Sequence, residues 1–158
     1  MSEIPLARTE QRERPKIDHL APFDAEYFKR LEGPDGWVAI GRENCRNQRY
    51  FTVMDSTGEK LGIVGLYDTA DDANISHTIV DPKYRGLGLA KDFKDKLLEA
   101  TGETYYVAAV DLENTASLAA MLKIPGIKIV SDQEYETEFH KRKFRFDKPA
   151  FDKNDSDI

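Results

Sequence analysis

The stretch that decides the fold is SHTIVDPKYRGLGLAKDFKDKLLEA, Ser76–Ala100. It begins with an apolar run that ends at Asp81, and it continues with two glycines one residue apart in RGLGLA. From Leu89 onward, apolar residues recur at helical spacing, with polar residues such as Lys94 between them. The pattern therefore predicts a strand, a glycine-rich turn and an amphipathic helix in direct succession, with Lys94 on the polar side of the helix.

The junction of turn and helix is suited to holding a phosphate. The first helical turn presents N–H groups without intrahelical partners and the positive end of the helix dipole. Gly86 and Gly88 let a bulky anion approach the backbone, and Arg85 adds a positive charge. A P-loop is excluded because GxxxxGK[ST] is absent, and GxGxA is one residue short of the dinucleotide-binding GxGxxG. On this patch alone, glycines that only shape a strand-to-helix turn remain an alternative.

Two longer segments resemble the signatures of the GNAT N-acetyltransferase superfamily. V-D-P-K-Y-R-G-L-G-L-A, residues 80–90, resembles the family's strand ending and its [QR]-x-x-G-x-[GA] turn. VDLENTASLAAMLKIPGIKI, residues 110–129, is similar to the family's N-x-x-[AS]-x-x-L-Y-x-K-x-G-F, matched at Asn114, Ser117 and Lys123. The resemblance extends over residues 17–146.

The resemblance and the order of the expected elements imply an α+β fold, with a GNAT-like mixed, mostly antiparallel sheet flanked by helices. A strand, a pyrophosphate loop and a helix would form its core. The domain would occupy residues 16–147, between a disordered arm (1–15) and a flexible tail (148–158). The expected helices are residues 23–33, 91–100 and 114–123. The expected strands are residues 36–41, 49–55, 60–68, 74–81, 104–112, 127–132 and 135–147.

The co-substrate implied by the resemblance is acetyl-CoA, and the reaction is direct attack of a primary amine on its thioester. The backbone N–H of Val80 would face the oxyanion that forms. The residues implied in cofactor binding are Thr78, Ile79, Val80, Arg85, Gly86, Leu87, Gly88, Leu89, Ala90, Asn114 and Ser117.

Proton transfer is less clearly assigned by the sequence. Strand alternation places on one face Asp72, Asn74, Ser76, Thr78 and Val80. Ser76 would lie on the substrate face, and Asp72 would act as a base through water. His77 lies on the other face between two isoleucines, which favours a packed, neutral histidine over a catalytic one.

Many relatives carry a tyrosine that protonates the leaving thiolate, and the corresponding position here is Met121. We interpret Met121 as a residue that packs the helix against the core. An acyl-CoA-binding GNAT-fold module with little or no catalysis therefore stays open beside the enzyme, as does a partner-binding domain with a purely structural glycine turn.

Composition narrows the function classes further. The 158 residues suit one domain, and the net charge of −6 argues against nucleic acid as the main partner. The basic run FHKRKFRF is therefore interpreted as a sheet strand. The three histidines and the single cysteine show no metal-ligand spacing. We expect a cytoplasmic protein, a monomer or homodimer without membrane contact, that acts on a small-molecule or protein amine.

Overall fold

The structure, a computed structural model, describes residues 13–149. Seven strands form one sheet in the order β1-β2-β3-β4-β5-β7-β6. The strands are β1 (His19–Pro22), β2 (Arg46–Met54), β3 (Lys60–Asp68), β4 (Ile75–Val80), β5 (Tyr105–Asp111), β6 (Lys128–Ile129) and β7 (Lys141–Asp147). The helices are α2 (Ala25–Glu32), the 3-10 turn η1 (Pro82–Tyr84), α3 (Leu89–Thr101), α4 (Thr115–Leu122) and α5 (Gln133–Phe139).

Neighbouring strands pair antiparallel everywhere except between β4 and β5, which run parallel. This confirms the expected α+β architecture with a mostly antiparallel sheet. Most of the expected arm and tail, residues 1–12 and 150–158, lies outside the described residues.

Two sequence expectations about secondary structure are wrong, and one strand was not expected. Residues 36–41 form irregular coil that ends in a turn instead of a strand, and Gly41 in that turn has a left-handed φ of 79°. Residues 133–139 form α5 because the Asp132 carboxylate accepts a hydrogen bond from the Tyr135 N–H and caps a helix there. β1, which the sequence did not reveal, is a four-residue strand that pairs with β2.

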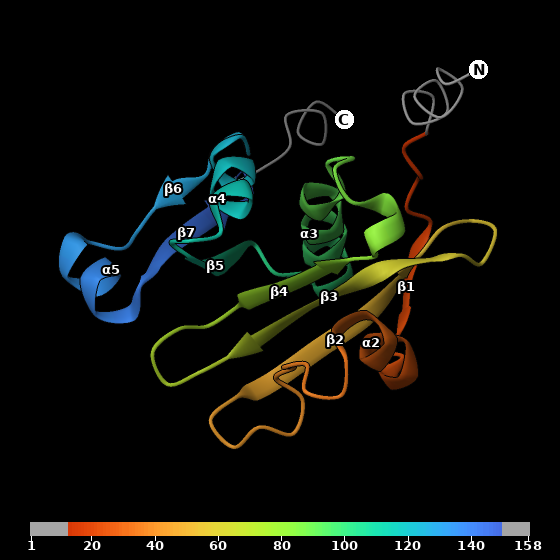
Figure 1. Cartoon of the computed structure of the whole chain (residues 1–158), viewed down its shortest axis with the longest axis horizontal. Helices are drawn as coiled ribbons and strands as arrows, with labels where there is room; N and C mark the ends of the chain where they lie inside the picture. Colours follow the sequence, from red (N-terminus) through yellow and green to blue (C-terminus); the bar gives the residue numbers. More distant parts are fainter. Residues whose placement is uncertain (1–12, 150–158) are drawn as a thin grey trace.

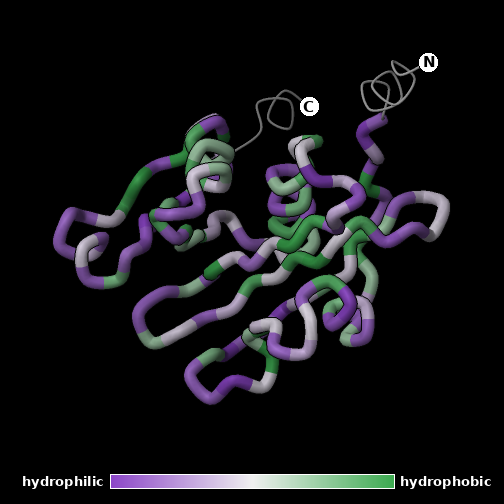
Figure 2. Tube along the Cα trace, in the orientation of Figure 1, coloured by the Kyte–Doolittle hydropathy of each residue, from purple (hydrophilic) through white to green (hydrophobic). Residues whose placement is uncertain are grey.

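Helices cover both faces of the sheet (Figure 1). α3 and α4 pack on one face over a core that includes Phe93, Leu97, Met121 and Phe144. α2 packs on the other face over a smaller core that includes Phe28, Tyr50 and Ile79. In Figure 2 the hydrophobic colour gathers toward the middle of the sheet, whereas the loops at the ends of the strands are mostly hydrophilic. The sheet is therefore the middle layer of three.

Alternation along β4 distributes its side chains between the two cores. Ile79 belongs to the core under α2, whereas Val80 packs against the core under α3. Thr78 is paired in register with Val64, a residue of the α3 core, so its side chain also points to the α3 side. The alternation does not extend upstream to Asn74, which has a left-handed φ of 57° and lies before the strand begins.

Candidate functional site

β4 and β5 form a fork at the centre of the sheet. Within the described residues they pair at one position, Ile75 with Val107, where the Val107 N–H donates to Asn74 O over 2.9 Å. Beyond that pair the two strands have no further ladder contact in the described chain. We call the gap between residues 76–80 of β4 and 108–111 of β5 the fork.

The backbone of β4 presents polar groups to the fork. The Asp81 N–H donates to Leu61 O over 2.9 Å, which fixes the phase of the β3–β4 ladder. In an antiparallel ladder, alternate residues bond to the neighbouring strand and the residues between them face away. Ile79 therefore bonds to β3, whereas Thr78 and Val80 direct their backbone groups toward the fork.

The glycine loop follows directly from this strand. Gly86 and Gly88 have φ values of 81° and 75°, a left-handed conformation that only glycine adopts without strain. A Cβ built at either position meets no atom within 4 Å, so the loop borders open space. Gly88 is the N-cap of α3 and supplies no side-chain cap. The first N–H groups of α3 therefore face that space without a side-chain acceptor.

Arginines stabilise both sides of the loop. The Arg85 Nε donates to Val80 O over 3.1 Å and so ties the loop back to the mouth of the fork. Arg14, which sequence reasoning placed in the disordered arm, donates to Gly88 O over 3.3 Å and pairs with Asp92 in the first turn of α3. These contacts bring two guanidinium groups to the N-terminus of α3.

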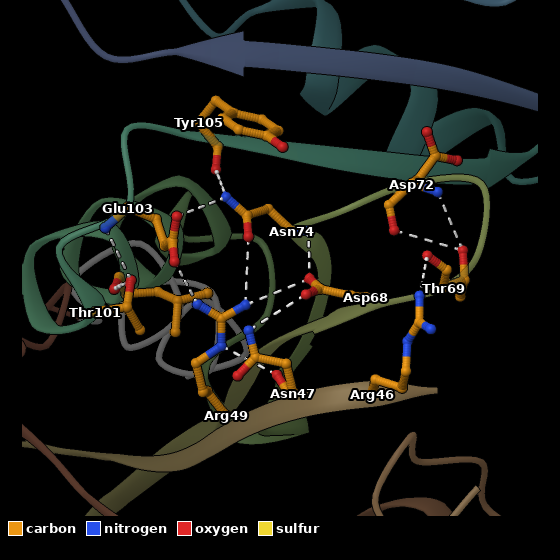
Figure 3. A network of polar contacts seen from close by, with 11 residues as sticks. Arg46, Asn47, Arg49, Asp68, Thr69, Asp72, Asn74, Thr101, Glu103 and Tyr105 are labelled. Carbon is orange, nitrogen blue, oxygen red and sulfur yellow. Dashed lines mark hydrogen bonds and ion pairs between the residues drawn. The ribbon is translucent and has the colours of Figure 1, made fainter. Parts of the chain in front are cut away.

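A polar network closes the other end of the fork (Figure 3). The buried Asn74 side chain donates to Glu103 Oε1 (3.0 Å) and Tyr105 O (3.1 Å), and accepts from Arg49 Nη2 (3.3 Å). Its backbone N–H donates to Asp68 Oδ1 over 2.9 Å. Asn74 thus links β2, the end of β3 and the segment that joins α3 to β5, at the point where β4 and β5 meet.

One buried polar atom in this region lacks a partner. Thr78 Oγ1 is the one buried side-chain nitrogen or oxygen among residues 13–149 without a hydrogen bond. An unpartnered buried hydroxyl costs free energy unless a ligand completes it. The fork therefore has unsatisfied backbone and side-chain groups in one place, with the uncapped helix at its mouth.

A family model described as "Acetyltransferase (GNAT) domain" matches residues 12–125. The chain belongs to the GNAT acetyltransferase family. A search of curated proteins gives no match.

Solved structures show the same GNAT fold at low sequence identity. The spermidine N-acetyltransferase of Vibrio cholerae, in complex with CoA and spermine, is 12% identical with a TM-score of 0.58, over 87% of this chain and 97% of that one. A chimera of the same enzyme with hSSAT is 14% identical, also with a TM-score of 0.58, over 85% and 96% of the two chains. The N-acetyltransferase PseH of Campylobacter jejuni, in complex with acetyl coenzyme A, is 12% identical with a TM-score of 0.51, over 79% and 77%.

In this GNAT domain, the two side chains expected to serve the reaction directly have partners of their own. The Asp72 carboxylate forms an ion pair with Lys143 Nζ of β7 at 2.7 Å. The Ser76 hydroxyl donates to Val107 O over 3.2 Å, beside the closed end of the fork. Ser76 therefore lies at the fork, whereas Asp72 lies in the β3–β4 loop, where its carboxylate is paired with Lys143.

His77 is built into the packing of the α2 face. The Tyr50 hydroxyl accepts a hydrogen bond from the Ala39 N–H (3.3 Å) and is hydrogen-bonded to His77 Nδ1 (2.9 Å). Burial, with a smaller effect from the charge of Lys94, lowers the pKa of His77 to about 4. The imidazole is therefore neutral at pH 7, as expected for a packed histidine.

α4 places the second motif of the family. The Asn114 side chain caps the helix by accepting from the Ser117 N–H over 3.1 Å. Met121 is buried in the core under α3 with 6% of its surface exposed, which confirms that it packs the helix.

Residues 13–149 contain neither a membrane-spanning helix nor a cluster of metal-ligating side chains. None of the helices within residues 13–149 combines the length and apolar character that crossing a membrane requires. Residues 13–149 also contain no group of three or more His, Cys, Asp or Glu side chains placed to hold a metal ion.

Proposed function

We propose that this GNAT domain is an acetyl-CoA-dependent N-acetyltransferase that transfers the acetyl group to a primary amine by direct attack. The observation that carries the proposal is the continuity of the fork with the glycine loop. Outward-facing backbone groups of Thr78 and Val80 lead directly to the uncapped N-terminus of α3. A ligand with a diphosphate at one end and an amide-rich arm at the other matches this arrangement.

The groups of this chain fit acetyl-CoA in three places. The N–H groups of residues 86–90 would hold the pyrophosphate, aided by Arg85 and by the helix dipole. The backbone groups of Thr78 and Val80, with the unpartnered Thr78 hydroxyl, would receive the pantetheine arm, whereas those of Ile79 pair with β3. Asn114 and Ser117, at the start of α4, would border the arm from β5. Acetyl-CoA, when bound, supplies the activated acetyl group.

The Val80 N–H would stabilise the oxyanion. It belongs to a rigid strand that β3 holds on its other edge, so it needs no reorganisation when negative charge develops. Removal of one oxyanion donor costs about 10²–10³ in kcat in other enzymes. The Ser76 side chain lies on the α3 side and its hydroxyl bonds to Val107 O, so it would border the pantetheine arm and not an acceptor on the opposite face. The ion pair of Asp72 with Lys143 argues against Asp72 as a free base.

The face opposite α3 is suited to a cationic acceptor. The Trp37 ring lies 5.5 Å from both the Tyr67 and the His77 rings, measured between centroids. The Arg42 guanidinium lies 5.4 Å from the centroid of the Trp37 ring, and a cation–π contact of the same kind would favour a cationic acceptor on this aromatic surface. The V. cholerae relative acts on spermidine and binds spermine, and an aliphatic polyamine is the first acceptor to test.

An acyl-CoA-binding module with little or no catalysis is the second candidate, favoured by Met121 at the position of the usual tyrosine. Release of free CoA thiol from acetyl-CoA, measured with spermidine, an amino acid and a peptide N-terminus, separates the candidates. Amine-dependent release supports the transferase. Binding of acetyl-CoA without release by any amine supports the module, and absence of binding overturns both.

A further inference from the structure

Asp81 joins the end of β4 to the glycine loop, and the proposed function leaves it without a role. It is 6% exposed although it carries a carboxylate. It follows Val80 directly and forms the N-cap of η1. A buried carboxylate costs free energy unless it is hydrogen-bonded, so the partners of Asp81 must offset this cost.

Both carboxylate oxygens of Asp81 are hydrogen-bonded. Oδ1 accepts from the Lys83 N–H over 3.0 Å and so caps η1. Oδ2 accepts from the Tyr27 hydroxyl of α2 over 2.8 Å. Burial, together with the hydrogen bond to Asp81, raises the pKa of Tyr27 far above its ordinary value, so the hydroxyl keeps its proton and acts as the donor. Asp81 therefore ties the entry of the loop to a helix that packs on the sheet.

The main chain of Asp81 is fixed as well. Its N–H donates to Leu61 O over 2.9 Å, and its C=O accepts from the Tyr84 N–H over 2.8 Å. The same residue thus ends the strand and begins the turn that follows it. Gly86 and Gly88 come directly after this turn, so the direction in which the chain leaves β4 sets where they lie.

A second anchor reaches η1 from the turn between β2 and β3. The Glu59 carboxylate accepts from Lys83 Nζ over 2.8 Å and from the Tyr84 hydroxyl over 2.9 Å. The Lys83 and Glu59 side chains are exposed, whereas Tyr27 and Asp81 are 5% and 6% exposed. A hydrogen bond in a low-dielectric environment is stronger than one in water, so the bond between Tyr27 and Asp81 is the firmer constraint on the loop.

We propose that Asp81, oriented by Tyr27, is a positioning residue of the co-substrate site and holds the glycine loop in the arrangement that receives the pyrophosphate. This assignment rests on the proposed function. The carboxylate is turned to Tyr27 and the Lys83 N–H, so Asp81 acts through the backbone of the loop and not by contact with acetyl-CoA. Val80 is held separately by its pairing with Gly62 of β3, so the effect of Asp81 falls on the loop. A preformed loop lowers the ordering cost of binding.

The first test compares CoA binding with stability. Calorimetry gives the Kd for CoA, and urea unfolding gives the midpoint, for wild type, Tyr27→Phe and the control Tyr50→Phe. Tyr50 is 6% exposed, and its hydroxyl also has two partners, the Ala39 N–H and His77 Nδ1, which lie outside the loop. Both variants should lower the urea midpoint by ~0.5–1 M, because each loses buried hydrogen bonds. Tyr27→Phe alone should weaken CoA binding, by about 10-fold, which corresponds to a loop in the competent arrangement about one-tenth of the time.

The second test is a rescue at Asp81 itself. Asp81→Asn keeps an oxygen for the Lys83 N–H and offers an N–H to the Tyr27 oxygen, whose proton can turn to Lys60 O at 3.3 Å. Asp81→Ala removes both hydrogen bonds. The two variants remove the same charge, so their effects on a nearby phosphate are matched. Asp81→Ala should bind CoA about 10-fold more weakly than Asp81→Asn.

The outcomes separate this inference from the proposed function. Tyr27→Phe that binds CoA as tightly as wild type overturns the role of Asp81, and so does Asp81→Asn that binds as weakly as Asp81→Ala. Equal losses of CoA affinity in Tyr50→Phe and Tyr27→Phe also overturn it, because the loss would then follow from stability alone. In each of these cases wild type still binds CoA, and the proposed function stands. Wild type that does not bind CoA contradicts the proposed function itself.

Discussion

Replacement of Asn74 by alanine should destabilise the protein more than the loss of one small polar side chain would suggest. Asn74 is 4% exposed and makes three side-chain hydrogen bonds, two of them to the charged groups of Glu103 and Arg49. Bonds to charged groups contribute ~1.5–3 kcal/mol and neutral ones ~0.5–1.5 kcal/mol. Arg49 and Glu103 also pair with each other at 2.7 Å, so they stay partly satisfied after the truncation. With ~1 kcal/mol for an alanine at left-handed φ, we expect a total loss of about 3–4 kcal/mol.

Asn47 is the matched control for this variant. It has nearly the same left-handed φ, 54°, but it is exposed, and its side chain makes one hydrogen bond, to Asp68 Oδ2 over 3.2 Å. Asn47→Ala should therefore cost about 1 kcal/mol, chiefly from the backbone conformation. Asn74→Gly removes the same side chain without the backbone strain and should lie between the two alanine variants.

The assay is equilibrium unfolding in urea followed by circular dichroism. With a slope of ~2 kcal/mol/M, the midpoint of Asn74→Ala should fall ~1 M below that of Asn47→Ala. Equal midpoints for the two variants would refute the view that Asn74 holds the closed end of the fork together.

Two further predictions concern buried groups. Burial lowers the pKa of His77 from its ordinary 6.5 to about 4. Between these pH values the unfolded chain binds one proton more than the folded chain. The free energy of unfolding should therefore fall by up to about 3 kcal/mol as the pH drops through that window. Urea midpoints at pH 7 and pH 4.5 should therefore differ more for wild type than for His77→Gln, and equal pH dependence of the two proteins contradicts the neutral state assigned to His77. Met121→Ala should cost ~2–4 kcal/mol because it leaves a cavity in the α3 core, whereas Leu122→Ala, at a position 53% exposed, should cost less than ~1 kcal/mol. Similar unfolding midpoints for these two variants would show that Met121 does not pack the helix.

The sequence predicted the centre of the fold because its signals there are local. Gly86 and Gly88 need left-handed φ values, and the apolar spacing after them fits one helix, so strand, loop and helix could be placed before any tertiary contact was known. Asp24 and Gly33 likewise cap α2 within one residue of the ends expected for that helix, 23 and 33. Local chemistry of this kind survives in the folded protein because it does not depend on distant partners.

The features missed by the sequence depend on distant partners. Asn74 acquires its role from Arg49, Glu103 and Tyr105, which come from two other segments of the chain. Lys94 was expected on the polar side of α3, but packing against a second strand covers that side as well, and no periodicity within the helix shows this. The opening of the fork is also a tertiary property, since it consists of ladder contacts that β4 and β5 do not make.

The most direct test of the account is calorimetric titration of acetyl-CoA into wild type, Gly88→Trp and Gly102→Trp. Gly88 and Gly102 lie at opposite ends of α3 with φ values of 75° and 76°, and a Cβ at either meets no atom within 4 Å. Both variants therefore carry the same backbone strain, but only Gly88→Trp fills the space before the helix N-terminus. The account predicts micromolar binding by wild type and Gly102→Trp, as for typical substrates, and its loss in Gly88→Trp. Unchanged affinity in a folded Gly88→Trp, or no binding by wild type, would contradict a pyrophosphate site at this loop.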